Sequence, residues 1–507
     1  MNERRTGTDR SHRGSKPKER AAWKKGPRPG AAGARPGVTD ASAEQVKIGD
    51  RIVVTIKRIG INGEGVGYYR KKAVFLDGAL PGEVVRAKVS AVHDKHIVAA
   101  VTAYEKESPD RRQPPCPVYE RCGGCQLQHL AYEGQLRAKE ELVREAFRRY
   151  AGIEGQALPL KPMLGMDDPW HYRNKAQLQL GAGRDGRIVA GLYEAQSHQL
   201  VDITGCTIQH DRINQTVEEV KAILERLHIA PYDVKRRSGV VRTIIVRTGF
   251  QSNDLQLTLV TGTETLPKND QLVSELLRKV PDLTTIAHNI NTRKTSLVFG
   301  DKTRILWGKP TMEDSLGDVK FSLSPRAFFQ LNPQQTLKLY EAVRVAAALS
   351  GRERVVDAYC GTGTIALWLA PYAAEVRGIE IIPEAVDNAR QNAERSGRTN
   401  AAFYAGEAEA LLPRWVKDGY RPDVIVVDPP RTGCDERLLR AILAAKPKRL
   451  VYVSCNPSTL AKDCKALLAG GYELASVQPV DMFPQTAHVE CCVLLTKCND
   501  TRLNGWS

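Results

Sequence analysis

The sequence of 507 residues contains no run of apolar residues long enough to cross a membrane, which takes about 20. The first residues, Met1–Arg5, are not followed by the apolar segment of a secretory signal. Acidic side chains are in the minority, since 58 Asp and Glu stand against 74 Lys and Arg, a formal net charge of +16. These absences predict a cytoplasmic protein without a membrane span. The charge favours a polyanionic partner such as nucleic acid, although a basic surface can also serve solubility alone.

The length predicts several domains, and 42% hydrophobic residues are enough for packed cores. Residues 1–41 are rich in Gly, Pro, Arg and Lys and predict a disordered basic arm, with a net charge of +7 over residues 1–40. Residues 42–105 hold short β-branched runs between turn residues, typical of a small OB-like β-barrel. We expect an α+β module with a cysteine-rich loop over residues 106–310. Strands and helices alternate over residues 311–507, which predicts a doubly wound α/β sheet.

Three of the 11 cysteines form a tight group, Cys116-x5-Cys122-x2-Cys125, among prolines and glycines that suit a loop around a metal centre. Cys206, in a turn-like Thr-Gly-Cys-Thr segment, is the nearest candidate for a fourth ligand. Four cysteines can hold either an iron–sulfur cluster or zinc. Because zinc sites more often show two separated Cys-x2-Cys pairs, the spacing favours an iron–sulfur cluster over zinc, and both over ordinary packing.

The segment Arg354–Leu367 has the pattern of a strand, a glycine-rich turn and a helix. Gly361 and Gly363 would let the backbone approach a ligand at the carboxyl end of the strand, where open α/β sheets bind ligands. The next predicted strand ends at Glu380, whose carboxylate could accept hydrogen bonds from both ribose hydroxyls. This geometry serves S-adenosylmethionine and NAD alike, so a nicotinamide-dependent redox enzyme stays open at this point.

Three further polar residues stand at predicted strand ends. Asp428 begins the segment Asp-Pro-Pro-Arg, Cys455 lies in Ser-Cys-Asn-Pro, and Glu490 comes at the start of the last strand. If that strand is antiparallel to its neighbours, all three residues share one edge of the sheet. A thiolate that adds to C6 of uracil makes C5 nucleophilic, and a base must then remove the C5 proton. We expect Cys455 to be the nucleophile and Glu490 the base.

Arg431 follows the two prolines, where amine methyltransferases place an aromatic residue, and a positive charge there could favour the thiolate. The same thiol chemistry would serve a cytosine-5 methyltransferase, and Cys455 could instead be a buried strand cysteine.

Together these motifs resemble the RNA uracil-5-methyltransferase family, particularly its bacterial branch that acts on 23S ribosomal RNA. The resemblance rests on the barrel, which is similar to a TRAM domain, the cysteine spacing, Phe328–Asn332, Asp-Pro-Pro-Arg, Ser-Cys-Asn-Pro and the late Glu490. It implies a Rossmann-like methyltransferase domain and a [4Fe–4S] cluster on the four cysteines. It also implies that S-adenosylmethionine contacts Gln330, Tyr359, Glu380 and Asp428, with Cys455 as nucleophile and Glu490 as base.

The resemblance implies 23S ribosomal RNA as the partner of a monomer, because transfer-RNA members of the family typically lack the barrel and the cluster. The basic arm lies outside the family pattern. The segment Trp170–Lys175 offers aromatic rings and cations for RNA, or is an ordinary approach to a strand. Uracil-5 methylation of transfer RNA and a non-catalytic RNA-binding factor remain alternatives.

Overall fold

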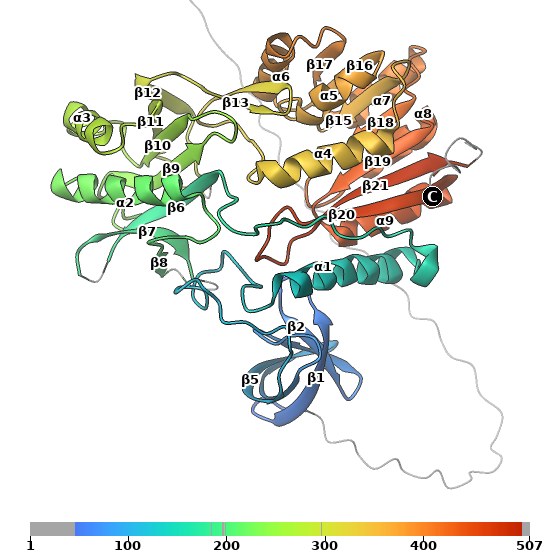
Figure 1. Ribbon diagram of the computed structural model, residues 1–507, viewed down its shortest axis with the longest axis horizontal. Helices are drawn as coiled ribbons and strands as arrows, with labels where there is room; N and C mark the ends of the chain where they lie inside the picture. The colour runs from blue at the N-terminus through green and yellow to red at the C-terminus, as the bar shows by residue number, and fades with distance from the viewer. Residues whose placement is uncertain (1–45, 184, 195–196, 198, 296, 499–507) are drawn as a thin grey trace, which may run out of the picture. The chain divides into compact units, whose positions relative to one another are not determined.

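The computed structural model describes residues 46–498, except residues 184, 195, 196, 198 and 296. The chain beyond Val46 forms one compact unit, which contains a small barrel, a central sheet, a hairpin and a C-terminal sheet (Figure 1). The predicted basic arm, residues 1–41, lies outside the described residues. Within the described part of the chain, no helix has the length and apolarity that a membrane span requires.

The N-terminal barrel is closed, with strands in the order β1-β2-β3-β5-β4. The β-branched alternation of β1 explains its burial, because Ile52, Val54 and Ile56 point into the barrel while the residues between them face outward. The predicted small β-barrel is therefore confirmed, and it has five strands. Its strands are β1 (Arg51–Ile59), β2 (Gly65–Tyr69), β3 (Lys72–Leu76), β4 (Val84–Val92) and β5 (His96–Lys106).

The helix after the cysteine loop, α1 (Tyr132–Ala146), ends in a π-helical turn over Phe147–Ala151, and a 3-10 turn follows at Gly155–Ala157. A fully buried ion pair joins α1 to the C-terminal domain, with Lys139 Nζ 2.5 Å from Asp481 Oδ1. Tyr132 donates a hydrogen bond of 2.9 Å to Asp481 Oδ2. Loss of one partner from such a buried pair typically costs about 3–5 kcal/mol. The pair therefore holds α1 on the segment that leads to Glu490.

The central module is an α+β unit built on a seven-stranded mixed sheet, in the order β12-β11-β10-β9-β6-β7-β8. One face of the sheet packs its aliphatic side chains against two helices, α2 (Asp211–Arg226) and α3 (Asn269–Lys279). The strands are β6 (Lys175–Ala182), β7 (Ile188–Tyr193), β8 (Leu200–Asp202), β9 (Val241–Thr248), β10 (Leu255–Thr261), β11 (Thr285–Ile290) and β12 (Lys302–Gly308). The hairpin of β13 (Met312–Leu316) and β14 (Val319–Leu323) follows.

The C-terminal sheet has the order β17-β16-β15-β18-β19-β21-β20. Strands β15 to β19 pair in parallel, whereas β21 runs antiparallel to both β19 and β20. The antiparallel last strand on which the site prediction depended is therefore confirmed. The strands are β15 (Arg354–Ala358), β16 (Glu375–Glu380), β17 (Ala401–Ala405), β18 (Val424–Val427), β19 (Arg449–Ser454), β20 (Tyr472–Val480) and β21 (Glu490–Lys497).

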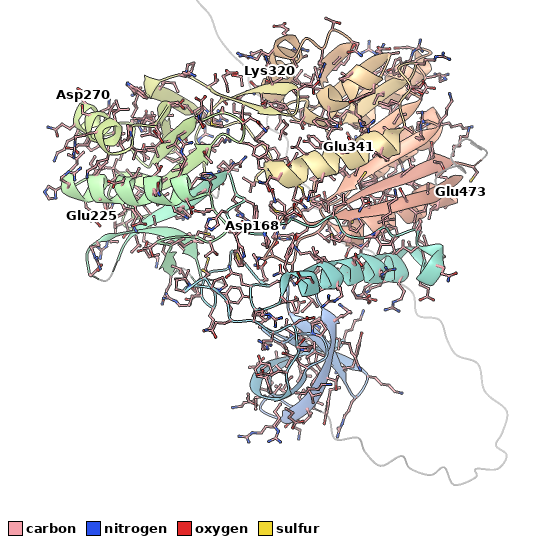
Figure 2. The ribbon with its side chains drawn as sticks, viewed as in Figure 1. Asp168, Glu225, Asp270, Lys320, Glu341 and Glu473 are labelled. Atoms are coloured by element: carbon pink, nitrogen blue, oxygen red, sulfur yellow. The ribbon has the colours of Figure 1, made fainter. Side chains whose placement is uncertain are left out.

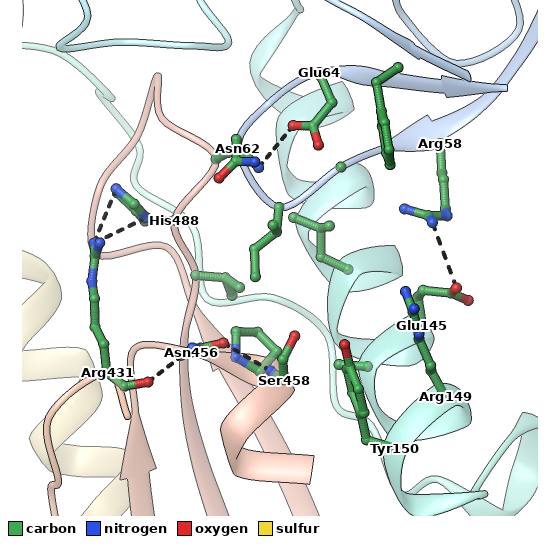
Figure 3. Close-up of a pocket in the computed structure, with 18 of the residues that line it drawn as sticks. Arg58, Asn62, Glu64, Glu145, Arg149, Tyr150, Arg431, Asn456, Ser458 and His488 are labelled. Atoms are coloured by element: carbon green, nitrogen blue, oxygen red, sulfur yellow. Dashed lines mark hydrogen bonds and ion pairs between the residues drawn. The ribbon is translucent and has the colours of Figure 1, made fainter. Parts of the chain in front are cut away.

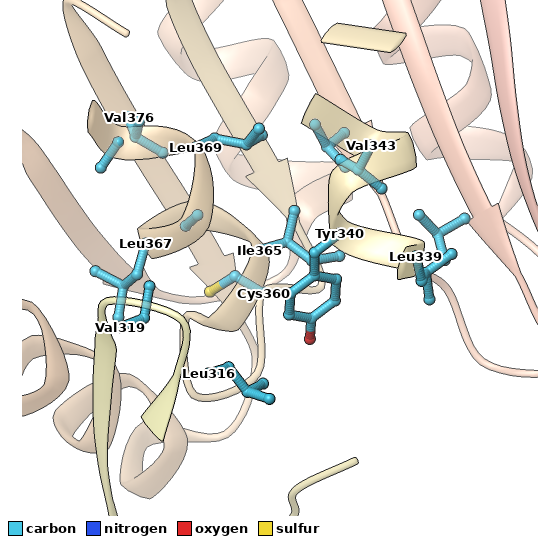
Figure 4. Packing of buried hydrophobic residues seen from close by; sticks show 14 of the residues in the cluster. Leu316, Val319, Leu339, Tyr340, Val343, Cys360, Ile365, Leu367, Leu369 and Val376 are labelled. Carbon is cyan, nitrogen blue, oxygen red and sulfur yellow. The ribbon is translucent and has the colours of Figure 1, made fainter. Parts of the chain in front are cut away.

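Helices cover both faces of this sheet, as a doubly wound fold requires. One core contains side chains of α4, α5 and α6, among them Tyr340, Val343 and Ile365 (Figure 4). The other contains side chains of α7, α8, α9 and α1. Charged side chains such as Glu341 and Glu473 lie on the outside (Figure 2). The helices are α4 (Pro333–Ala347), α5 (Thr364–Leu369), α6 (Pro383–Arg395), α7 (Ala408–Lys417), α8 (Glu436–Ala445) and α9 (Pro457–Ala469), with a 3-10 turn at Ala370–Tyr372.

Candidate active site

The strand register brings Cys455 and Glu490 together. Ser454 at the end of β19 pairs with Cys491 of β21, so the next residue on one strand and the preceding residue on the other meet at the same edge. Asp428 follows β18, the parallel neighbour of β19, and ends at that edge too. The structure thus assembles the three predicted residues from segments that are up to 62 positions apart in the sequence.

The three acidic groups all have raised pKa values, chiefly because of burial. Burial raises the pKa of the Cys455 thiol to about 11, and the neighbouring carboxylates Glu490 and Asp428 add to the shift. Burial also raises the pKa of Glu490 to about 8, with a further contribution from Asp428, and raises that of Asp428 to about 7. A dry site with several acids keeps protons at neutral pH that exposed groups would release. The positive charge of Arg431 acts the other way, lowering the pKa values of Cys455 and Glu490.

Arg431 is held by both its side chain and its backbone. One guanidinium nitrogen, Nη2, lies 3.3 Å from the Nε2 atom of His488. The carbonyl oxygen of Arg431 accepts a hydrogen bond of 3.0 Å from Asn456 Nδ2. Burial, and then the charge of Arg431, lowers the pKa of His488 to about 4, so its ring is neutral at pH 7. The sequence analysis did not assign His488 to the site. Its position two residues before Glu490 was the signal that could have done so, because alternate residues of a strand lie on the same face.

The loop after β19 is fixed by a helix cap. The side chain of Asn456 accepts a hydrogen bond of 3.1 Å from the backbone N–H of Ser458, at the start of α9. Pro457 occupies the first helical position, where its missing N–H and fixed φ are favourable. The Ser-Cys-Asn-Pro segment therefore owes its conformation to the cap, which holds Cys455 at the end of β19.

The turn after β15 has the form of a ligand cradle. Gly361 and Gly363 have φ values of +55° and +83°, which favour glycine. An added Cβ on Gly361 would meet no atom within 4 Å, so the space beside it is open. Glu380 accepts hydrogen bonds from the backbone N–H groups of Gly361 (3.1 Å) and Ile382 (3.0 Å). These bonds place the carboxylate at the cradle, as predicted for a ribose-binding residue.

The other predicted cofactor residues lie around the same edge. Tyr359 has a φ of +68° and donates a hydrogen bond of 2.8 Å to Glu409 Oε1. The side chain of Gln330 hydrogen-bonds the hydroxyl of Tyr340. The negative charge of Asp428 helps to raise the pKa of that hydroxyl. The carbonyl of Gln330 accepts a hydrogen bond of 3.1 Å from Asn174 Nδ2 of the central module. Gln330 is therefore attached to the central module through its backbone and to helix α4 through its side chain.

The four predicted metal-ligand cysteines line one small cavity, together with Arg173. Burial raises the pKa values of Cys122, Cys125 and Cys206, that of Cys125 to about 12. Within the described residues, no group of three His, Cys, Asp or Glu side chains is arranged to hold a single metal ion. Arg173 has a buried Nε atom without a hydrogen-bond partner, and its positive charge acts on Cys125 and Cys206. This unsatisfied cation beside the thiols suits an anionic group larger than one ion.

A larger cavity of about 820 Å³ opens at Cys455. Arg431, Cys455 and Asn456 form one wall, and barrel residues and the end of α1 form the rest (Figure 3). Glu490 and Asp428 do not line this cavity. Of the three groups, Cys455 is the one that lines this cavity.

Comparisons with known proteins agree with this geometry. Residues 131–498 match the family model for tRNA (uracil-5-)-methyltransferase, and residues 45–98 match the TRAM domain. An uncharacterized RNA methyltransferase of Halalkalibacterium halodurans is 53% identical over 450 residues, covering 89% of this chain and 97% of the relative. Another, from Listeria monocytogenes, is 48% identical over 450 residues, covering 89% and 98%.

One solved structure matches most of the chain. The crystal structure of Pyrococcus abyssi tRNA (uracil-54, C5)-methyltransferase in complex with S-adenosyl-L-homocysteine has a TM-score of 0.69 and 26% sequence identity. The match covers 88% of this chain and 100% of that protein. The chain therefore belongs to the S-adenosylmethionine-dependent RNA (uracil-5-)-methyltransferase family and has a TRAM domain at its N-terminal end.

Proposed function

We propose that this protein methylates C5 of a uridine in RNA through a covalent bond between Cys455 and C6 of the uracil. The observation that carries the proposal is the register of β19 and β21, which sets the thiol beside Glu490 and Asp428. This pairing of a nucleophile with a carboxyl base is what the reaction needs. The nicotinamide alternative has no comparable support, since the matching relatives are methyltransferases.

The chain's residues divide the reaction into two covalent stages. Cys455 Sγ, as the thiolate, adds to C6, and the electron pair of the C5–C6 double bond becomes available at C5. S-adenosylmethionine, when bound, supplies the methyl group that C5 takes. Glu490, as the carboxylate, then accepts the proton from C5, the double bond re-forms and the C6–S bond breaks. The raised pKa of Glu490, about 8, makes it a stronger base than an exposed carboxylate.

The cofactor residues follow from the edge of the sheet. We infer that Glu380 binds the ribose hydroxyls, Gln330 and Tyr359 contact the cofactor, and Asp428 lies where cofactor and uracil meet. Gly361 supports this placement, because the open space beside it would otherwise be filled by a side chain. Arg431 favours the charged forms of Cys455 and Glu490 through its positive charge.

We propose that Cys116, Cys122, Cys125 and Cys206 hold a [4Fe–4S] cluster. The shared cavity and the unsatisfied Nε of Arg173 support an anionic cluster there, and such a cluster would fix the cysteine loop to the central module. A structural zinc ion is the alternative, and the cysteine spacing favours it less because zinc sites more often have two separated Cys-x2-Cys pairs. The proposed reaction draws on no redox step of the cluster.

We propose 23S ribosomal RNA as the substrate, because the TRAM domain and the four cysteines fit the ribosomal branch that the sequence resembles. Transfer RNA is the alternative that the family model and the Pyrococcus abyssi enzyme favour. A uridine must leave its stack to reach Cys455, which suits a single-stranded target in either RNA.

The decisive experiment incubates the purified protein and S-adenosylmethionine with cellular RNA that carries 5-fluorouridine. Fluorine replaces the proton that Glu490 removes, so the covalent complex cannot resolve. We expect an RNA adduct that survives denaturation, and sequencing of the trapped RNA identifies ribosomal or transfer RNA. Absence of an adduct, while RNA and cofactor both bind, would overturn the assignment of Cys455 and favour a binding role.

A further inference from the structure

The cavity at Cys455 has a second wall that the proposed reaction leaves unused. This wall belongs to the barrel and includes the loop Gly60–Glu64, which joins β1 to β2. Figure 3 shows Asn62 and Glu64 across the cavity from Arg431 and Asn456. The cavity volume of about 820 Å³ lies toward the upper end of the range for ligand sites, about 300–1,000 Å³. It therefore has room for more than the uracil ring.

The barrel loop is fixed against the segment that carries the catalytic base. Gly63 has a φ of +94°, and an added Cβ there would lie 2.5 Å from the Cβ of Gln126 and 3.6 Å from that of Ala487. The backbone N–H of Gln126 in turn donates a hydrogen bond of 3.0 Å to the carbonyl of Gln485. Because only glycine fits at Gly63, the loop packs closely against residues just before Glu490. Side chains on the loop thus hold a set position relative to the thiol.

Glu64 has unused hydrogen-bonding capacity. Its Oε2 atom accepts a hydrogen bond of 3.0 Å from the backbone N–H of Asn62, while Oε1 has no donor within the described part of the chain. The side-chain amide of Asn62 is exposed and likewise has no partner among the described residues. Glu145, by contrast, also lines the cavity and is paired with Arg148 at 2.6 Å.

A carboxylate on the wall of an RNA site is repelled by phosphates, so its favourable partners are donors on a base and the ribose 2′-hydroxyl. Carboxylates accept hydrogen bonds from exocyclic amino groups, and side-chain amides pair with adenine. Adenine, cytosine and guanine carry such an amino group, whereas uracil carries none. Because every ribose carries the same hydroxyl, a contact from Glu64 or Asn62 that depends on the nucleotide must go to a base edge.

We propose that Glu64, assisted by the amide of Asn62, reads the base of a nucleotide adjacent to the target uridine and favours a base with an exocyclic amino group. This inference rests on the proposed function, because it assumes that the uridine binds at Cys455. It makes the barrel loop a determinant of sequence specificity and gives the TRAM domain a role inside the active-site cavity.

The test uses the full-length protein and the RNA fragment recovered in the trapping experiment. The fragment is synthesised as a pool with 5-fluorouridine at the target and random nucleotides on either side, and the covalent adducts are sequenced. We expect wild type to disfavour uracil at one flanking position by about tenfold, as one good base contact allows. Glu64→Gln keeps the acceptor for Asn62 N–H, and we expect it to lower the preference to about threefold or less.

Asp77→Asn is the matched control, because Asp77 lines the same cavity and the substitution removes the same charge. The control should keep the wild-type flanking preference. Equal preferences in wild type and Glu64→Gln, or equal losses in Glu64→Gln and Asp77→Asn, would overturn the assignment. Failure of wild type to form any adduct would instead refute the proposed function, so the two failures are distinguishable.

Discussion

Two groups of cysteines lie in very different surroundings in this protein. The four cysteines of the small cavity have one another and the cation Arg173 for neighbours, and loops carry them. Cys455 stands alone at a strand end, with two buried carboxyl groups and Arg431 around it. Burial raises the thiol pKa in both places, to about 12 for Cys125 and about 11 for Cys455. We therefore expect the difference in partners, rather than in burial, to separate the proposed cluster ligands from the proposed nucleophile.

The largest expected effect follows from removing the single thiol. We expect Cys455→Ala to lose methylation by on the order of 10³-fold or more and to form no adduct with 5-fluorouridine RNA, since no other group can attack C6. Iron content should stay at the wild-type level. Methylation and adduct counts, with iron assayed on the same sample, measure this; residual adduct in Cys455→Ala would assign the nucleophile elsewhere.

Substitution of Glu490, the proposed base, should have the second largest effect on methylation. Glu490→Gln should slow turnover by about 10²–10⁴-fold, the usual contribution of a general base. An RNA adduct should nevertheless form on ordinary RNA, because Cys455 still attacks C6 while the C5 proton stays in place. Denaturing gels of the variant with unmodified RNA and S-adenosylmethionine test this. Wild-type turnover in Glu490→Gln would exclude Glu490 as the base.

Substitution of a cysteine in the small cavity should change iron content and stability and leave the reactivity of Cys455 unchanged. Cys125→Ala should lose bound iron and lower the free energy of unfolding, because the loop loses its attachment to the central module. Alkylation of Cys455 in the folded variant should keep its wild-type rate. Iron analysis, denaturant unfolding and iodoacetamide labelling distinguish the two regions. If Cys125→Ala retained full iron content, the four-cysteine assignment would be wrong.

The smallest expected effect is a shift in the titration of Cys455. Its alkylation rate should rise with pH up to about 11, as the thiolate forms. Glu490→Gln removes a neighbouring negative charge and should move this midpoint down, by on the order of one pH unit. Arg431→Met removes the opposing positive charge and should move it up. Rates at a fixed pH below the midpoint check both directions, because Glu490→Gln should raise them and Arg431→Met should lower them. Rates that neither variant changes would contradict the electrostatic coupling.

The raised pKa of Glu490 also predicts how the free energy of unfolding depends on pH. The pKa of Glu490 is raised in the folded protein, so the folded state holds this proton more tightly than the unfolded chain does. The resulting stabilisation is complete below pH 4.5 and is lost as the pH rises to about 8. Denaturant unfolding of wild type should show this loss, and Glu490→Gln should lack it. An identical pH trend in both proteins would exclude the linkage.

Local patterns were sufficient for most of the architecture. Short β-branched runs predicted the barrel, and the alternation of strands and helices predicted the C-terminal sheet, because both follow from side-chain periodicity within a few residues. The candidate nucleophile, the base, Glu380 and Asp428 could be named from the same source, since each stands at a strand end, whereas Gln330 and Tyr359 were named from the family resemblance alone. His488, the buried pair Lys139–Asp481 and the role of Gly63 were missed, because each depends on a partner distant in the sequence.

The sequence by itself determined which chemical groups are present and on which elements they lie, because hydrophobic periodicity and turn residues act locally. Only the tertiary structure decided which of these groups meet. The antiparallel β21 brings Glu490 to Cys455, and burial at that edge raises the pKa values of both. Strand pairing and desolvation are properties of the whole fold, so the thiol's partners and the barrel wall opposite it became visible only there.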